Sequence, residues 1–125
     1  MGQQNQQAKQ LSTYADAVAA FVKDLNQTGK LNDTLVMTFS EFGRRVEQNA
    51  SNGTDHGTAN NVLLFGGQIK KPGIFNEAPN LSDLDNGDLK YQIDFRQVYA
   101  TMLDKWLGVN NAQVLGKNFA GLAVV

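Results

Sequence analysis

The single histidine of the chain, His56, directly follows Asp55 in a glycine-flanked stretch, Gly53-Thr54-Asp55-His56-Gly57. A carboxylate beside an imidazole supplies oxygen and nitrogen donors that suit Zn²⁺ and similar cations. The glycines permit sharp turns of the backbone, which would let neighbouring side chains converge. In the alternative interpretation the stretch is structural, and Asp55 accepts hydrogen bonds from amides of a polar loop. Because Asp-His-Gly also occurs by chance, its spacing alone favours the structural interpretation.

A second cluster, Ser40-Glu41-Phe42-Gly43-Arg44, lies where a predicted strand ends. Ligands of open α/β sheets bind at the carboxyl ends of strands, so Glu41 is expected to face a crevice there. The planar guanidinium group of Arg44 is suited to phosphate or sulfate. The alternative is a surface ion pair between Glu41 and one of the two arginines that follow, which would contribute little to stability.

The two clusters together are a stronger signal than either alone. Glu41 and His56 are separated by one predicted loop between two predicted strands, so both can reach the same end of a sheet. With Asp55 they provide two carboxylates and one imidazole, which would form part of the coordination sphere of a divalent cation. The sequence therefore predicts a metal site formed by Glu41, Asp55 and His56, with Arg44 as an anion-binding residue.

The elements that would position these residues begin with an amphipathic helix. Apolar residues recur in steps of three and four, which predicts a helix over residues 8–28 that ends next to Gly29. Residues 1–7 are predicted to be disordered. Leucine, valine, methionine and phenylalanine nearly fill residues 34–40, which predicts a buried strand parallel to its neighbours.

The candidate site residues fall in residues 41–60, which are predicted to form a long polar loop. A second short apolar run follows at residues 62–65. Residues 68–75 are predicted to turn at Pro72-Gly73, with a small hairpin as one interpretation.

The last strong element is a second helix. Its apolar stripe begins after Asp94, which forms a capping box with Gln97, and Gly108 is expected to follow its end. The apolar tail, residues 114–125, is expected to add a strand or to pack across an exposed face. These elements predict an α/β fold with a partial doubly wound sheet and two main helices.

The predicted elements are too few to complete such a sheet. A buried strand needs covered faces, and a parallel pair needs a crossover of about a dozen residues or more. The chain, residues 1–125, is therefore predicted to be a single domain or a fragment of a larger domain. A missing N-terminal half of the parent domain, or another copy of the chain, would complete the sheet.

The composition argues against several other classes of protein. The chain has 11 Lys and Arg against 12 Asp and Glu, for a formal net charge of −1, which argues against a nucleic-acid partner. No apolar run approaches the ~20 residues of a membrane span, and the N-terminus shows no signal-peptide core. The absence of cysteine excludes disulfides, thiolate metal sites and thiol nucleophiles.

Ser-Glu-Phe-Gly-Arg at residues 40–44, followed by Gly-Thr-Asp-His-Gly at residues 53–57, resembles the C-terminal part of DUF1501 proteins, which are sulfatase-like members of the alkaline phosphatase superfamily. The resemblance covers roughly residues 10–110 and includes residues 66–70 and 94–96. It implies the C-terminal segment of an alkaline phosphatase-like fold. It further implies hydrolysis of phosphate or sulfate esters with zinc or manganese, in a periplasmic or secreted parent protein.

Residue by residue, the resemblance puts Glu41 on a carboxylate ligand and His56 on a later histidine ligand of the metal site. Asp55 would be a ligand or a partner that fixes the imidazole tautomer, and Phe42 stands where superfamily members usually have His or Asn. No residue here corresponds to the Ser or Thr nucleophile, so the chain alone is expected to be inactive. The alternative is a non-catalytic binding or assembly module with the same scaffold and no metal.

Overall fold

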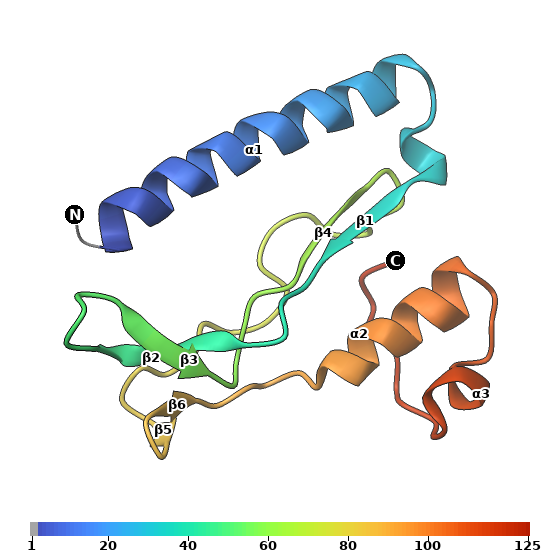
Figure 1. The fold of residues 1–125 in the computed structure, drawn as a ribbon. Coiled ribbons are helices and arrows are strands. Elements are labelled where there is room, and N and C mark those ends of the chain that lie inside the picture. The colour runs from blue at the N-terminus through green and yellow to red at the C-terminus, as the bar shows by residue number, and fades with distance from the viewer. Residues whose placement is uncertain (1–2) are drawn as a thin grey trace. The chain divides into compact units, whose positions relative to one another are not determined.

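The computed structural model describes residues 3–125 and has a mixed α/β fold with small antiparallel sheets (Figure 1). The described residues form three α-helices and three two-stranded sheets. The chain divides into two compact units. The ribbon unit comprises the chain up to Gly67 together with Asn80–Lys90, and the helical unit comprises Gln68–Pro79 together with Tyr91–Val125.

The first element of the ribbon unit is helix α1, Gln3–Gln27. The helix begins earlier than predicted, so residues 3–7, which were expected to be disordered, belong to it. Residues 1 and 2 of that expectation lie outside the described residues. The backbone N–H of Gln3 donates to the carbonyl of Asn52 at 3.3 Å, which ties the helix start to a distant turn of the same unit.

The end of α1 agrees with the prediction. Gly29 has a φ of 70°, and the N–H of Lys30 donates to the carbonyl of Leu25 at 2.8 Å, which is the hydrogen bond of a Schellman motif. The ring of Tyr14 lies 6.5 Å from the ring of Phe65 on a strand, so the apolar stripe of the helix faces the strands. That stripe is half-buried and consists of Tyr14, Val18, Val22 and Leu25.

Four strands of the ribbon unit form one long antiparallel ribbon in two parts (Figure 1). The outer part is the pair farther from the hairpin turn, in which β1 (Leu35–Thr38) pairs with β4 (Leu63–Gly66). The inner part is the pair next to that turn, in which β2 (Gly43–Gln48) pairs with β3 (Thr54–Gly57). Residues 39–42 and 58–62 separate the two parts and are called the break, and the returning chain carries one extra residue there.

The prediction of a buried, parallel strand at residues 34–40 is wrong. Strand β1 pairs antiparallel, and all four of its residues are half-buried. The reason is the connection: residues 41–60, predicted to form a loop, contain the β2–β3 hairpin, and a hairpin returns the chain antiparallel. The 62–65 run does form a strand, β4, as its apolar residues suggested.

A small hairpin adds to the inner part of the ribbon. Strands β5 (Leu84–Asp85) and β6 (Asp88–Leu89) are joined by Asn86 and Gly87, which both have positive φ, as a type I′ turn requires. Arg45 of β2 forms a 3.1 Å ion pair with Asp88 of β6. This contact attaches the small hairpin to β2.

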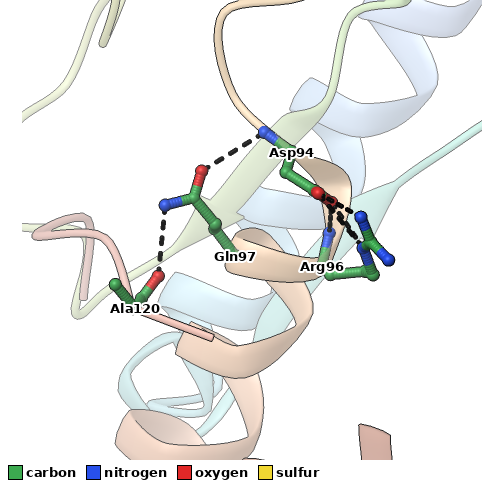
Figure 2. Close-up of polar contacts among 4 residues, drawn as sticks. All are labelled: Asp94, Arg96, Gln97 and Ala120. Atoms are coloured by element: carbon green, nitrogen blue, oxygen red, sulfur yellow. Dashed lines mark hydrogen bonds and ion pairs between the residues drawn. The ribbon is translucent and has the colours of Figure 1, made fainter. Parts of the chain in front are cut away.

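The helical unit contains helix α2, Phe95–Thr101, which continues as a π-helical segment, η2, Met102–Trp106. The predicted capping box is confirmed (Figure 2). The carboxylate of Asp94 accepts from the backbone N–H of Arg96 at 2.9 Å, and the side chain of Gln97 accepts from the N–H of Asp94 at 3.2 Å. Gly108 follows the helix with a φ of 64°, as predicted.

The Asp94 carboxylate also binds the guanidinium group of Arg96 (Figure 2). This side-chain hydrogen bond, helped by the backbone N–H of Arg96, lowers the pKa of Asp94 from its ordinary value to about 2. A lowered pKa in the folded state stabilises the fold above the ordinary pKa, and that contribution is lost as the pH falls toward 2.

We therefore expect the Asp94→Asn variant to be less stable than the wild type above pH 4, and the difference to vanish between about pH 4 and pH 2. Asparagine is also a good N-cap, so the change mainly removes the ion pair. Thermal unfolding of both proteins across this pH range measures the difference. An advantage of the wild type that persisted unchanged below pH 2 would contradict this origin.

Every buried hydrophobic residue among those described lies in the helical unit, namely Val98, Ala100 and Met102. The tail adds no strand to a sheet within the described residues, in contrast to one of the two expectations for it. Its first residues belong to helix α3, Asn111–Leu115, and the N–H of Leu122 donates to the hydroxyl of Thr101 on α2 at 2.7 Å. The residues described between 68 and 75 form no strand, so the hairpin interpretation of that segment is wrong.

Candidate functional site

The pairing of β2 with β3 brings the two sequence clusters side by side. Gly43 is opposite Gly57, and Arg44 is opposite His56. Glu41 and Phe42 lie in the break, immediately before β2. The two clusters, separated by a hairpin turn in sequence, therefore share one end of the inner ribbon.

The closest contact between the clusters is made by two rings. The Phe42 ring stacks on the imidazole of His56, with centroids 3.6 Å apart and planes inclined by 14°. The guanidinium carbon of Arg44 lies 5.4 Å from the centroid of the same Phe42 ring. Phe42 is half-buried, whereas His56 and Arg44 are exposed, so the phenyl ring underlies two exposed side chains of opposite strands.

Glycine is required at the start of β2. A Cβ at the buried Gly43 would lie 1.5 Å from the backbone oxygen of Ala59, on the returning chain. A Cβ at Gly57 would lie 2.9 Å from the carbonyl carbon of Arg44. The glycines of both clusters thus allow the two chains to approach each other beside the ring stack.

The side chain of Asp55 points away from that of His56. Successive side chains of a strand point to opposite faces, so Asp55 and His56 diverge on β3. The Oδ1 atom of Asp55 accepts a hydrogen bond of 2.9 Å from the side-chain amide of Asn49. Asn49 in turn accepts from the backbone N–H groups of Ser51 and Gly53 in the hairpin turn. Asp55 therefore supports the turn, close to the role that the structural interpretation gives it.

The two arginines of β2 have different partners. Nη1 of Arg44 donates to the carbonyl of Thr54 at 2.9 Å, which leaves other donors of this exposed guanidinium group available. Arg45 is held by Asp88 of β6. Within residues 3–125, Glu41 forms an ion pair with neither arginine, so the surface ion pair considered from the sequence is not formed.

The donors of Glu41 and His56 have the chemistry that zinc or manganese accepts, and both residues are exposed. They are only part of a metal site, because a catalytic zinc site needs three protein ligands and an open position. Residues 3–125 contain no group of three or more histidine, aspartate or glutamate side chains placed to hold an ion. The donor set therefore fits a partial site, in which water or further ligands would fill the remaining positions around the ion.

The contact of Phe42 with His56 was not predicted from the sequence, in which Phe42 stands out only as a departure from a family pattern. Its contact with His56 depends on the register of β2 against β3, and residues 41–60 were expected to form a loop. The signal that was present is the pair of glycines that follow Phe42 and His56, which become opposite each other when the segment is folded as a hairpin.

Residues 1–121 match the model of the family described as "Protein of unknown function (DUF1501)". Because the match covers nearly the whole chain, the chain belongs to the DUF1501 family, as the two clusters suggested. No curated protein and no solved structure matches the chain. Among the helices described in residues 3–125, none combines the length and the hydrophobicity that a membrane span requires.

Proposed function

We propose that this chain is the C-terminal segment of a metal-dependent hydrolase of phosphate or sulfate esters with an alkaline phosphatase-like, doubly wound fold. Glu41 and His56 would supply donors to a zinc or manganese ion, and Arg44 would bind the anionic group of the ester. The observation that carries the proposal is the contact between Phe42 and His56, because it puts the segment that bears Glu41 beside the imidazole.

The chemistry of each side chain determines its role in the proposed site. A bound divalent ion would polarise the ester and lower the pKa of a bound water. The carboxylate of Glu41 and the imidazole of His56 would hold that ion, while the free donors of Arg44 would orient the phosphate or sulfate group. Asp55 stays a predicted metal-side residue, with less support, because Asn49 already binds its carboxylate.

The unpaired edges and exposed apolar residues of the ribbon unit support the proposal that another part of the parent domain packs against it. The outer pair, β1 and β4, has no further strand paired at either edge in the described residues, and an isolated two-stranded ribbon is only marginally stable. Phe39 in the break is 68% exposed, and Leu63 of β4 is 43% exposed. The N-terminal half of the parent domain, or another copy of the chain, would cover this surface, and the former would bring the nucleophile.

The metal part of the proposal is tested by titrating Zn²⁺ and Mn²⁺ while thermal unfolding is followed. An ion that binds only the folded state stabilises it by about 2.7 kcal/mol at one hundred times its Kd. We expect this gain in the wild type, a loss of it in the His56→Ala and Glu41→Gln variants, and its retention in Glu47→Gln. Glu47 is the matched control, because it is an exposed glutamate on the neighbouring strand β2.

The absence of any gain at ion concentrations well above micromolar would contradict the metal site. It would favour the second candidate, a non-catalytic binding or assembly module with the same scaffold. A specific feature favours this candidate: residue 42 is a phenylalanine, which has no donor for an ion, where the superfamily usually has a polar ligand. A periplasmic or secreted location of the parent protein is part of the first proposal only.

A further inference from the structure

We propose that Phe42 is a positioning residue, which fixes the plane of the His56 imidazole and thereby directs the ring nitrogens of His56 toward a ligand. The inference rests on the proposed function in taking that ligand to be a divalent metal ion. It differs from the proposed function in assigning a role to a side chain that has no donor atom.

The rings of Phe42 and His56 overlap almost completely. Aromatic pairs prefer offset or edge-to-face arrangements, whereas Phe42 and His56 are nearly parallel at 3.6 Å between centroids. The overlap follows from the backbone, since the pairing of Arg44 with His56 sets the imidazole across from the strand that Phe42 precedes. One face of the imidazole is thus covered, although His56 as a residue is exposed.

Stacking on the face of an imidazole leaves its ligand-binding atoms available. The lone pair of the unprotonated ring nitrogen lies in the plane of the ring, so an ion approaches from the edge, while Phe42 covers the face. The phenyl ring offers no competing donor or acceptor of its own. An exposed histidine without this contact would lose side-chain freedom when it bound an ion, and prior ordering of the ring removes part of that cost.

The contact between Arg44 and Phe42 extends the same ordering to the guanidinium group beside His56. Its guanidinium group lies over the Phe42 ring, and one of its nitrogens is held by the Thr54 carbonyl. Arg44 and His56 are the directly opposed pair of the two strands, so a single phenyl ring restrains both members of that pair. Loss of the ring is therefore expected to loosen both side chains while the glycine-lined pairing of the strands remains.

The first test uses the fact that the chain has a single histidine, so one set of imidazole resonances reports on this site. In the wild-type full chain, the carbon-bound protons of His56 should be shifted upfield by the Phe42 ring. The Phe42→Leu variant should lose this shift, and Phe42→Tyr should keep it. Phe39→Leu is the matched control, because it removes an exposed phenylalanine from the same segment.

The second test follows the same resonances during a Zn²⁺ titration. Residues that orient a metal ligand typically contribute 10–100-fold to affinity, so Phe42→Leu should weaken zinc binding by about that factor, with Phe42→Tyr restoring it. Retained backbone contacts between Gly43 and Gly57 would verify that the hairpin of each variant is folded.

The outcomes separate the two proposals. Wild-type resonances at the positions of free histidine, or equal zinc affinity in the wild type and a folded Phe42→Leu variant, would overturn the positioning role. If zinc leaves the His56 resonances of the wild type unmoved while the upfield shift is present, the proposed metal function fails and the stack itself stands.

Discussion

The Gly43→Ala substitution is expected to unfold the inner part of the ribbon. The new methyl group would overlap the backbone oxygen of Ala59, at 1.5 Å, and a backbone atom cannot move aside as the end of a side chain can. Overpacking of this kind costs about 3 kcal/mol or more, because the break would have to open. Hydrogen exchange of the β2 and β3 amides, together with chemical denaturation, measures the loss.

The matched control is Gly53→Ala in the turn of the same hairpin. The nearest atom to a Cβ there is Oε1 of Gln3, at 3.2 Å, which is the end of a flexible side chain. A glycine-to-alanine change at a compatible position alters stability by less than about 1 kcal/mol. Similar stability of the two variants would contradict the claim that the close approach at Gly43 determines the ribbon. The imidazole resonances of His56 should also lose their upfield shift in Gly43→Ala alone.

Features that depend on neighbouring residues in sequence could be predicted. The capping box at the start of α2 requires only Asp94 and Gln97 three residues apart, and it is formed. The left-handed conformations of Gly29 and Gly108, which follow helices, are likewise local. Each of these depends on hydrogen bonds within a few residues, so the sequence pattern contains the whole cause.

Strand direction could not be predicted in the same way. An apolar run such as residues 34–40 indicates a strand, but not whether its neighbour is parallel, because that depends on how the intervening chain returns. The intervening strands β2 and β3 are polar and largely exposed, so they lack the alternation of apolar residues by which strands are detected. The hairpin was therefore taken for a loop.

For the candidate site, the sequence indicated that the two clusters lie close together, but not in which direction each side chain points. The pairing of Arg44 with His56 depends on the register of the strands, and the divergence of Asp55 from His56 depends on the alternation of β3. Both become visible only once the segment is known to be a hairpin. The metal role of Glu41, Asp55 and His56 stays a prediction, to which the zinc titration applies.

A polar network centred on Asn111 holds the apolar tail, and the composition of the tail does not reveal it. Asn111, at the start of α3, is 3% exposed, and its side-chain amide donates to Asp104 at 2.6 Å and to Asn118 at 3.1 Å. Its side-chain oxygen accepts from the N–H of Phe119 at 2.9 Å. The Asn111 side chain thus connects segment η2, which bears Asp104, to Asn118 and Phe119 of the tail.

The Asn111→Ala substitution is expected to destabilise the helical unit by about 2–3 kcal/mol, because it deprives a partly buried N–H and two oxygen acceptors of their partner. Fluorescence of Trp106, the single tryptophan, reports this unit during denaturation. Gln113→Ala is the matched control, since that amide is exposed on the same short helix and alanine favours helix formation. Equal denaturation midpoints for the two variants would show that the buried amide of Asn111 does not hold the tail. A loss of stability confined to Asn111→Ala, with the His56 resonances unchanged, would show that the helical unit depends on this amide and that the ribbon unit does not.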